Sequence, residues 1–213
     1  MTRTIVCFGD SNTHGASSTD QERYPRDARW PGVMRAALGP GFEVVEEGLS
    51  GRTTVFDSPL TPQRSGAEYL LPCLWSHQPV DLVIIMLGTN DLKRTYGLAA
   101  PEIASGASRL VDMARESLAG PEGLPPQVLL VAPVPLGPAS AASELWGFGA
   151  SREESRKLAR LYRLVAAQAG VAFLDAGAVA EIGGGDGVHL DPSAHAGLGA
   201  AMADAVRGML PPD

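Results

Sequence analysis

Residues 4–15 read TIVCFGDSNTHG, a short apolar run followed at once by glycine and polar residues. The run TIVCF, residues 4–8, has the length and the β-branched and aromatic content of a buried strand. The polar half, GDSNTHG, places Ser11 just beyond the end of that strand, between an acid and an amide. A serine at such a point can cap a helix or act as a nucleophile, and other parts of the chain must distinguish the two.

The apolar run of residues 4–8 is the first of several that alternate with helical patterns. Further strand-like runs cover residues 43–46, 82–87, 128–132 and 171–174. Apolar residues at helical spacing cover residues 28–38, 99–118, 152–169 and 193–210, with Ser193 expected as the N-cap of the last helix. This alternation predicts an α/β fold with a parallel sheet covered on both faces. We expect one domain over residues 1–213.

The amino-acid composition of the chain limits the classes of molecule that it is expected to bind. Apolar residues make up 45 % of the 213 residues, and the net charge is −7 with scattered basic residues. This pattern predicts no nucleic-acid partner, which a basic patch would indicate. The longest apolar run, residues 82–87, is too short to span a membrane. With no signal-peptide pattern at the start of the sequence, we expect a cytoplasmic location.

Small polar residues follow four of the expected strands. The segments are GDSNTHG at 9–15, EGLSGRTT at 47–54, GTND at 88–91 and DGVHL at 186–190. Ligands of open parallel sheets bind beyond the carboxyl ends of the strands. We therefore expect these four segments to meet at one edge of the sheet.

The polar segments contain the residues needed for nucleophilic catalysis. A serine hydroxyl needs a base to take its proton, and the base is usually a histidine oriented by a carboxylate. His189 follows Asp186 by three residues, so Asp186 can reach the ring nitrogen that faces away from Ser11. The Ser11 and Gly51 N–H groups and the Asn90 amide are candidate donors to an oxyanion.

Other titratable residues compete for these roles. His195 follows an acid by four residues, but it falls inside the last expected helix and is a weaker candidate for the base. Asp10 and Asp91 each follow a strand end, where an acid commonly binds loop N–H groups, so we expect structural roles. His77 is expected to be a polar residue at a helix end.

The segments GDSN, Gly51 in its turn of small residues, GTND and DGVH resemble the four blocks of the SGNH (GDSL-type) hydrolases, in the family order. The wider sequence resembles the bacterial arylesterase and acyltransferase branch. The resemblance implies a three-layer α/β/α sandwich with a flavodoxin-like five-stranded parallel sheet. It implies Ser11 as nucleophile, His189 as general base and acid, and Asp186 as its orienting acid. It also implies Ser11, Gly51 and Asn90 as oxyanion donors.

The same resemblance implies the reaction. We expect hydrolysis of short-chain acyl or aryl esters through an acyl-enzyme, with water or an alcohol as the acyl acceptor. It also implies a homo-oligomer. The first block reads GDSN, not GDSL, so Asn12 and His14 are expected to make one side of the pocket polar, which argues against strong acyltransferase behaviour.

Three further residues are candidates for substrate binding. Arg52 binds substrate or pairs with an acid such as Glu47, and the second role is favoured. Trp146 and Phe148 lie in the irregular segment 133–150, and they could line the pocket, form a subunit contact or belong to the core.

Two alternatives to a simple ester hydrolase remain. The same triad could remove acetyl groups from carbohydrate or hydrolyse thioesters, because pocket walls determine specificity. A flavodoxin-like binding module without turnover is a different class, but it would be expected to lose Ser11, His189 or Asn90. The sequence has no HExxH and no paired CxxC motif, so we expect no metal and no cofactor.

Overall fold

The structure, a computed structural model, describes residues 2–20 and 22–211, and its centre is a five-stranded parallel sheet. The strands are β1 (Arg3–Gly9), β2 (Phe42–Gly48), β3 (Leu82–Met86), β4 (Gln127–Ala132) and β5 (Ala172–Asp175). Their spatial order is β2-β1-β3-β4-β5. This is the flavodoxin-like order, so the expected fold class is confirmed.

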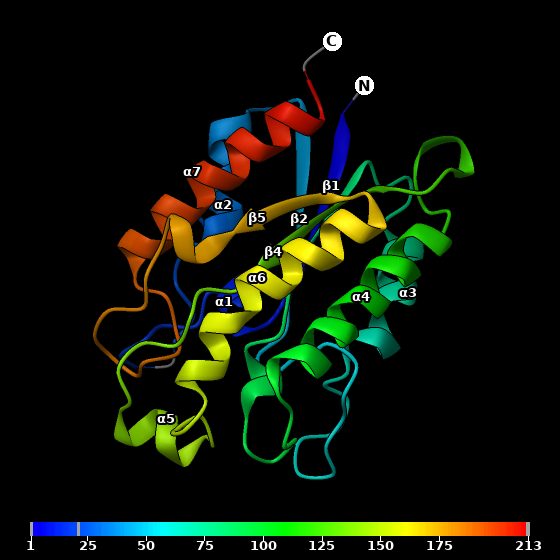
Figure 1. The fold of residues 1–213 in the computed structure, drawn as a ribbon. Coiled ribbons are helices and arrows are strands. Elements are labelled where there is room, and N and C mark those ends of the chain that lie inside the picture. Colours follow the sequence, from blue (N-terminus) through cyan, green and yellow to red (C-terminus); the bar gives the residue numbers. More distant parts are fainter. Residues whose placement is uncertain (1, 21, 212–213) are drawn as a thin grey trace.

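Helices cover both faces of the sheet (Figure 1). One layer contains α2 (Trp30–Leu38) and α7 (Pro192–Met209), and the other contains α3 (Gly66–Ser76), α4 (Ala100–Glu116) and α6 (Arg152–Ala169). Successive side chains of a strand point to opposite faces, so every strand position that both layers cover must be apolar. Accordingly Val6 and Phe8 pack under α3 and α4, whereas Ile5 and Cys7 pack under α2 and α7.

Several helix boundaries differ from the sequence prediction. The helix α2 begins at Trp30, two residues later than expected, with a proline in its first turn. The N-cap of α7 is Asp191 rather than Ser193, because the Asp191 carboxylate accepts from the Ala194 N–H group (2.8 Å). A five-residue helix, α5 (Ala141–Leu145), lies inside the segment expected to be irregular.

Of the helix α3, the sequence analysis predicted only an end at His77, which is its C-cap. The helix contains Gly66 and Pro72, two residue types that disfavour helix interiors. Its Leu70, Cys73 and Leu74 are buried against the sheet. Packing of this apolar face therefore stabilises a helix that local propensity does not favour.

A four-residue helix, α1 (Ser11–His14), follows β1 directly. Asp10 caps it by accepting from the Asn12 N–H group (2.9 Å), so Ser11 is the first helical residue and not the cap. The end of β2 packs closely on this helix, since a Cβ atom at Gly48 would lie 2.2 Å from the His14 nitrogen. Glycine at this position therefore allows β2 to approach α1.

The carboxyl ends of the strands point toward one side of the molecule. There β1 continues into α1, and β3 leads into the 3-10 helix η1 (Asn90–Leu92), while β5 leads into η3 (Ala176–Ala178). A third 3-10 helix, η2 (Pro121–Gly123), precedes β4. Among the described residues, no helix combines the length and apolarity needed to cross a bilayer.

Candidate active site

Three side chains from two distant parts of the chain meet in a line. The Ser11 hydroxyl lies 2.9 Å from His189 Nε2, and His189 Nδ1 lies 2.6 Å from Asp186 Oδ2. All three residues are buried, with exposed fractions of 5 to 7 %. In this geometry, one ring nitrogen can accept the serine proton while the carboxylate binds the opposite N–H group.

Asp186 also organises the loop that carries the histidine. Its Oδ1 accepts from the backbone N–H groups of Val188 and His189, both at 2.8 Å. Burial by itself would raise the pKa of Asp186, but the hydrogen bonds from His189 lower it below its ordinary value. The carboxylate therefore stays ionised at neutral pH and can accept the Nδ1 hydrogen of the adjacent ring.

Asn12 binds the same loop from the other side. Its side-chain Nδ2 donates to the Val188 carbonyl (3.2 Å), and its Oδ1 accepts from the Leu190 N–H group (3.0 Å). These two backbone groups flank His189. The expectation that Asn12 makes the pocket wall polar is therefore wrong: its amide is used in holding the histidine loop, and it is 5 % exposed.

The three expected oxyanion donors lie around Ser11. Within the described residues, the backbone N–H groups of Ser11 and Gly51 have no protein acceptor. Gly51 has a φ of +84°, in the left-handed region that favours glycine. Asn90 Nδ2 donates one hydrogen to the Arg52 carbonyl (3.1 Å) and carries a second. Ser11, Gly51 and Asn90 line one pocket together with His189.

Two buried acids support the loops beneath the site. Asp10 caps α1, and Asp91 accepts from the Thr54 N–H group (3.0 Å), which ties η1 to the loop after β2. Burial raises the pKa of each carboxyl to about 6. These contacts agree with the structural roles that the sequence predicts for both acids.

The pocket is a cavity of about 210 Å³. His14, Trp146 and Phe148 line it, and the Trp146 ring meets the His189 ring edge-on with 5.7 Å between centres. Burial lowers the pKa of His14. Two more polar residues, Ser50 and Lys93, line the pocket, and the sequence analysis gave neither of them a role, although Lys93 follows Asn90 by only three residues.

Arg52 lies outside this pocket. Its Nη1 donates to the carbonyl oxygens of Gly9 (2.9 Å) and Glu47, and its guanidinium stacks on the Phe8 ring at 4.2 Å. Arg52 is 3 % exposed. The structure thus gives Arg52 contacts that join the ends of β1 and β2, in agreement with the structural role that the sequence favours.

The remaining histidines lie away from Ser11. His195, fully buried in α7, accepts through Nδ1 from the Trp30 N–H group (3.2 Å) and so satisfies the first turn of α2. His77 ends α3, and its Nε2 lies 3.0 Å from a Glu47 carboxylate oxygen. Neither residue lines the pocket that contains Ser11.

One group of side chains has donor types that bind metals. Ligand atoms of Glu47, Cys73 and His77 all lie within 4.8 Å of one another. The guanidinium of Arg52 interacts with both Glu47 and Cys73, and its positive charge opposes a cation there. Burial raises the pKa of the Cys73 thiol to about 12, so the thiolate that binds metals best is disfavoured.

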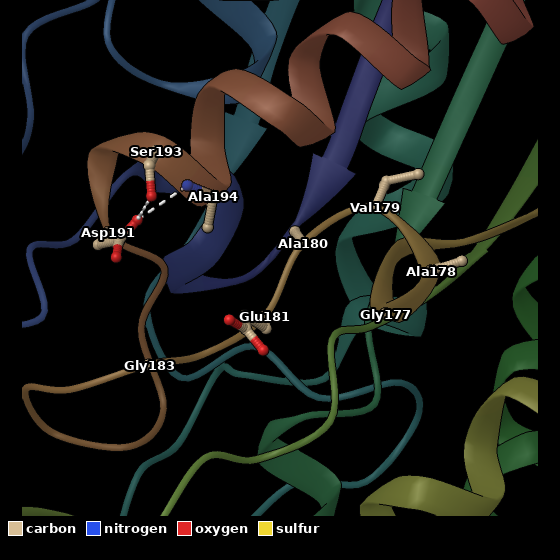
Figure 2. Close-up of a pocket in the computed structure, with 9 residues that line it drawn as sticks. All are labelled: Gly177, Ala178, Val179, Ala180, Glu181, Gly183, Asp191, Ser193 and Ala194. Carbon is tan, nitrogen blue, oxygen red and sulfur yellow. Dashed lines mark hydrogen bonds between the residues drawn. The ribbon is translucent and has the colours of Figure 1, made fainter.

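A second hollow, of about 400 Å³, lies between residues 177–183 and the start of α7 (Figure 2). Two acids, Glu181 and Asp191, line it, and Asp191 accepts from the Ser193 hydroxyl and the Ala194 N–H group (Figure 2). The residues that line it include no histidine. The hollow therefore lacks the serine–histidine pair that distinguishes the pocket around Ser11.

Comparison with known proteins finds close relatives. The fold matches the aryl esterase of M. smegmatis with a TM-score of 0.92 and 42 % identity, covering 98 % of this chain and 100 % of that one. The same values hold for a carbohydrate acetylesterase from Sinorhizobium meliloti. An acetylxylan esterase of Xylanibacter ruminicola is 25 % identical over 147 residues, which are 62 % of this chain and 28 % of that protein.

The chain spans less than a third of the length of the curated relatives it matches. A sequence match covers residues 7–196 and is to the GDSL-like lipase/acylhydrolase family. That match runs from β1 into α7 and so includes all four polar segments that follow the strands. The chain therefore belongs to the GDSL-like lipase/acylhydrolase family, as its resemblance to the SGNH hydrolases predicts.

Proposed function

We propose that this protein is a serine carboxylic ester hydrolase that acts on short-chain acyl esters through an acyl-enzyme. The observation that carries the proposal is the line of contacts from Ser11 through His189 to Asp186, at 2.9 and 2.6 Å. Membership of the family supports it, as does 42 % identity to an aryl esterase over nearly the whole chain.

The geometry supports a two-step reaction. In the first step, Ser11 Oγ attacks the ester carbonyl carbon, while His189 Nε2 takes the hydroxyl proton and Asp186 stabilises the charged ring. The oxyanion receives hydrogen bonds from the N–H groups of Ser11 and Gly51 and from the Asn90 amide. As the tetrahedral intermediate collapses, His189 returns the proton to the departing alcohol.

The second step reverses these roles. Water attacks the acyl carbon of the ester on Ser11, and His189 takes a proton from that water. Collapse of the second intermediate breaks the bond to Ser11 Oγ, which regains the proton from His189. An alcohol that replaces water would instead produce a new ester, so acyl transfer uses the same groups.

Pocket size supports a short acyl group. A cavity of about 210 Å³, closed on one side by Trp146 and Phe148, is smaller than typical drug-sized sites of roughly 300 Å³ or more. Removal of acetyl groups from carbohydrate is the second candidate, because a relative of 42 % identity is a carbohydrate acetylesterase. Both candidates use the same triad and differ in the alcohol that leaves.

The experiment compares initial rates on p-nitrophenyl acetate, butyrate and octanoate for the wild type and Ser11→Ala. We expect acetate to be hydrolysed fastest and Ser11→Ala to be near the uncatalysed rate. Octanoate as the best substrate would contradict the short acyl pocket. A Ser11→Ala variant that retains most of the rate would contradict the nucleophile. Acetate release from acetylated xylan oligosaccharides then distinguishes the carbohydrate candidate.

Two finer statements belong to the same proposal. We expect a homo-oligomer, and Leu145, 84 % exposed on α5 near the pocket wall, is an apolar side chain that a subunit contact would cover. Sedimentation analysis of wild type and Leu145→Glu tests this.

A cytoplasmic location stays a prediction, which fractionation of the source cells would test.

A further inference from the structure

The wall of the catalytic pocket contains a lysine to which the proposed mechanism gives no role. Lys93 follows η1 directly and lines the same cavity as Ser11 and His189. Its ammonium nitrogen lies 5.3 Å from the centre of the Phe148 ring, which lines that cavity too. A cation over an aromatic face is attracted to it, so this contact helps to keep the ammonium group beside the pocket.

Lys93 has no ion-pair partner in the part of the chain that the structure describes. The residue is partly buried. Burial lowers the pKa of Lys93, while the charge of Asp10, in the loop beneath, raises it. Partial burial of an ammonium group without a carboxylate costs free energy, which a bound anion would offset.

Two acids lie near the cavity but not in its lining: Asp186 is bound to His189, and Asp10 acts on Lys93 from the loop beneath. None of the described residues that line the cavity is an acid, and burial favours the neutral form of His14. A second cation, Arg64, lies behind Gly51, with its Nε atom 3.4 Å from where a Cβ atom at Gly51 would be. Arg64 also repels Lys93 electrostatically. The described lining of the cavity thus contains a cation and no acid, although the chain carries a net charge of −7.

We propose that this site prefers esters that carry a carboxylate in their acyl or alcohol part, and that Lys93 binds this carboxylate. The inference rests on the proposed ester hydrolysis and names its substrate class. A carboxylate beside Lys93 would replace the water that the ammonium group loses in the pocket wall. The cavity is small, so only a carboxylate a few bonds from the ester group can reach both Ser11 and Lys93.

The test uses matched anionic and neutral esters. For the alcohol part, 4-acetoxybenzoate is compared with its neutral methyl ester, and for the acyl part, the monophenyl ester of glutaric acid is compared with phenyl pentanoate. The quantity measured is the ratio of kcat/KM for the anionic ester to that for its neutral partner, after subtraction of the rate without enzyme. Both values come from one preparation, so the ratio does not depend on the folded fraction.

Three variants separate charge from other effects. We expect Lys93→Gln to lower the ratio by about tenfold to a hundredfold in at least one of the two pairs. Lys93→Arg keeps the charge and should keep the ratio within a few-fold of the wild type. Arg94→Gln removes the same charge from the next residue, which is exposed and does not line the cavity that contains Ser11, and should leave the ratio unchanged.

Added salt provides a second measurement on the wild type. Raising NaCl from about 0.02 to about 0.5 M should lower the ratio severalfold, because mobile ions screen the attraction. If salt and Lys93→Gln leave the ratio unchanged in both pairs, the inference is overturned. If Lys93→Gln does not fold, the salt result alone decides. If the wild type hydrolyses none of the four esters, the proposed function itself fails.

Discussion

Replacing Asn12 by leucine is expected to slow hydrolysis without weakening substrate binding. The Asn12 amide joins α1 to the loop on either side of His189, through Val188 and Leu190. Leucine has a similar volume but can form neither hydrogen bond. The variant therefore loosens the histidine and leaves Ser11 in place.

The structure indicates the size of the effect. Val188 and Leu190 are 2 % and 1 % exposed, so water cannot readily replace the lost partners. An unsatisfied buried donor or acceptor costs about 1–3 kcal/mol, so the free energy of unfolding should fall by roughly 2–5 kcal/mol. Displacement of His189 by a fraction of the 2.9 Å that separates it from Ser11 should lower kcat by about tenfold to a hundredfold.

The assay measures kcat and KM for phenyl acetate, with the folded fraction determined by circular dichroism at the same temperature. We expect KM to stay within a few-fold of the wild type, because Asn12 does not line the pocket. Thr13→Val is the matched control: Thr13 is the next residue of α1 and fully buried, and its hydroxyl has no hydrogen-bond partner. It should leave kcat unchanged.

A folded Asn12→Leu enzyme with wild-type kcat would refute the reasoning, because His189 would then be positioned without the amide. A rise in KM with unchanged kcat would instead return Asn12 to the substrate pocket, where the sequence analysis placed it.

Asp186→Asn should lower kcat by about 10³–10⁴-fold for p-nitrophenyl acetate, because an amide cannot stabilise the charged ring of His189; a loss below tenfold would exclude Asp186 as the orienting acid. Asn90→Ala should lower kcat by about 10²–10³-fold, since it removes one oxyanion donor, and an unchanged kcat in the same assay would remove Asn90 from the oxyanion site. Burial lowers the pKa of His195 from 6.5 to about 4, so the unfolded chain takes up a proton first and stability falls as pH drops from about 6.5 to about 4. His195→Asn keeps an acceptor for the Trp30 N–H group. Between pH 7 and pH 4.5, its free energy of urea unfolding should fall by roughly 2 kcal/mol less than that of the wild type; equal losses would contradict the burial of a neutral ring.

Local sequence patterns predicted the fold well where one physical effect dominates. The strands β1, β3 and β4 are nearly continuous apolar runs because both of their faces are covered, and α6 was predicted to the residue from its apolar spacing. The body of the helix α3 was missed, and only its end at His77 was predicted, because Gly66 and Pro72 disfavour a helix whose buried face is stabilised by packing against the sheet. The α7 cap was misplaced by two residues, because Ser193 and Asp191 are both good caps and backbone geometry selects one.

The residue types of the candidate site were also readable, since a serine, a histidine with a nearby acid and an asparagine each follow a strand. The sequence predicted the role of each side chain less well. Asn12 and His14 were predicted to share a pocket wall, but they lie on a short helix whose sides face different neighbours. His14 faces the cavity and Asn12 faces the histidine loop. Neighbours in sequence diverge in this way because successive helical residues point about 100° apart.

The sequence by itself determined the alternating strands and helices, the residues at the strand ends and the family to which they belong. These features depend on short-range periodicity and on residue type. The tertiary structure decided that Ser11 meets His189, 178 residues away, and that Asn12 holds the loop between them. It also decided that Lys93, which has no ion-pair partner among the described residues, lies in the same cavity. Contacts of this kind depend on distances across the end of the sheet, which only the packed chain defines.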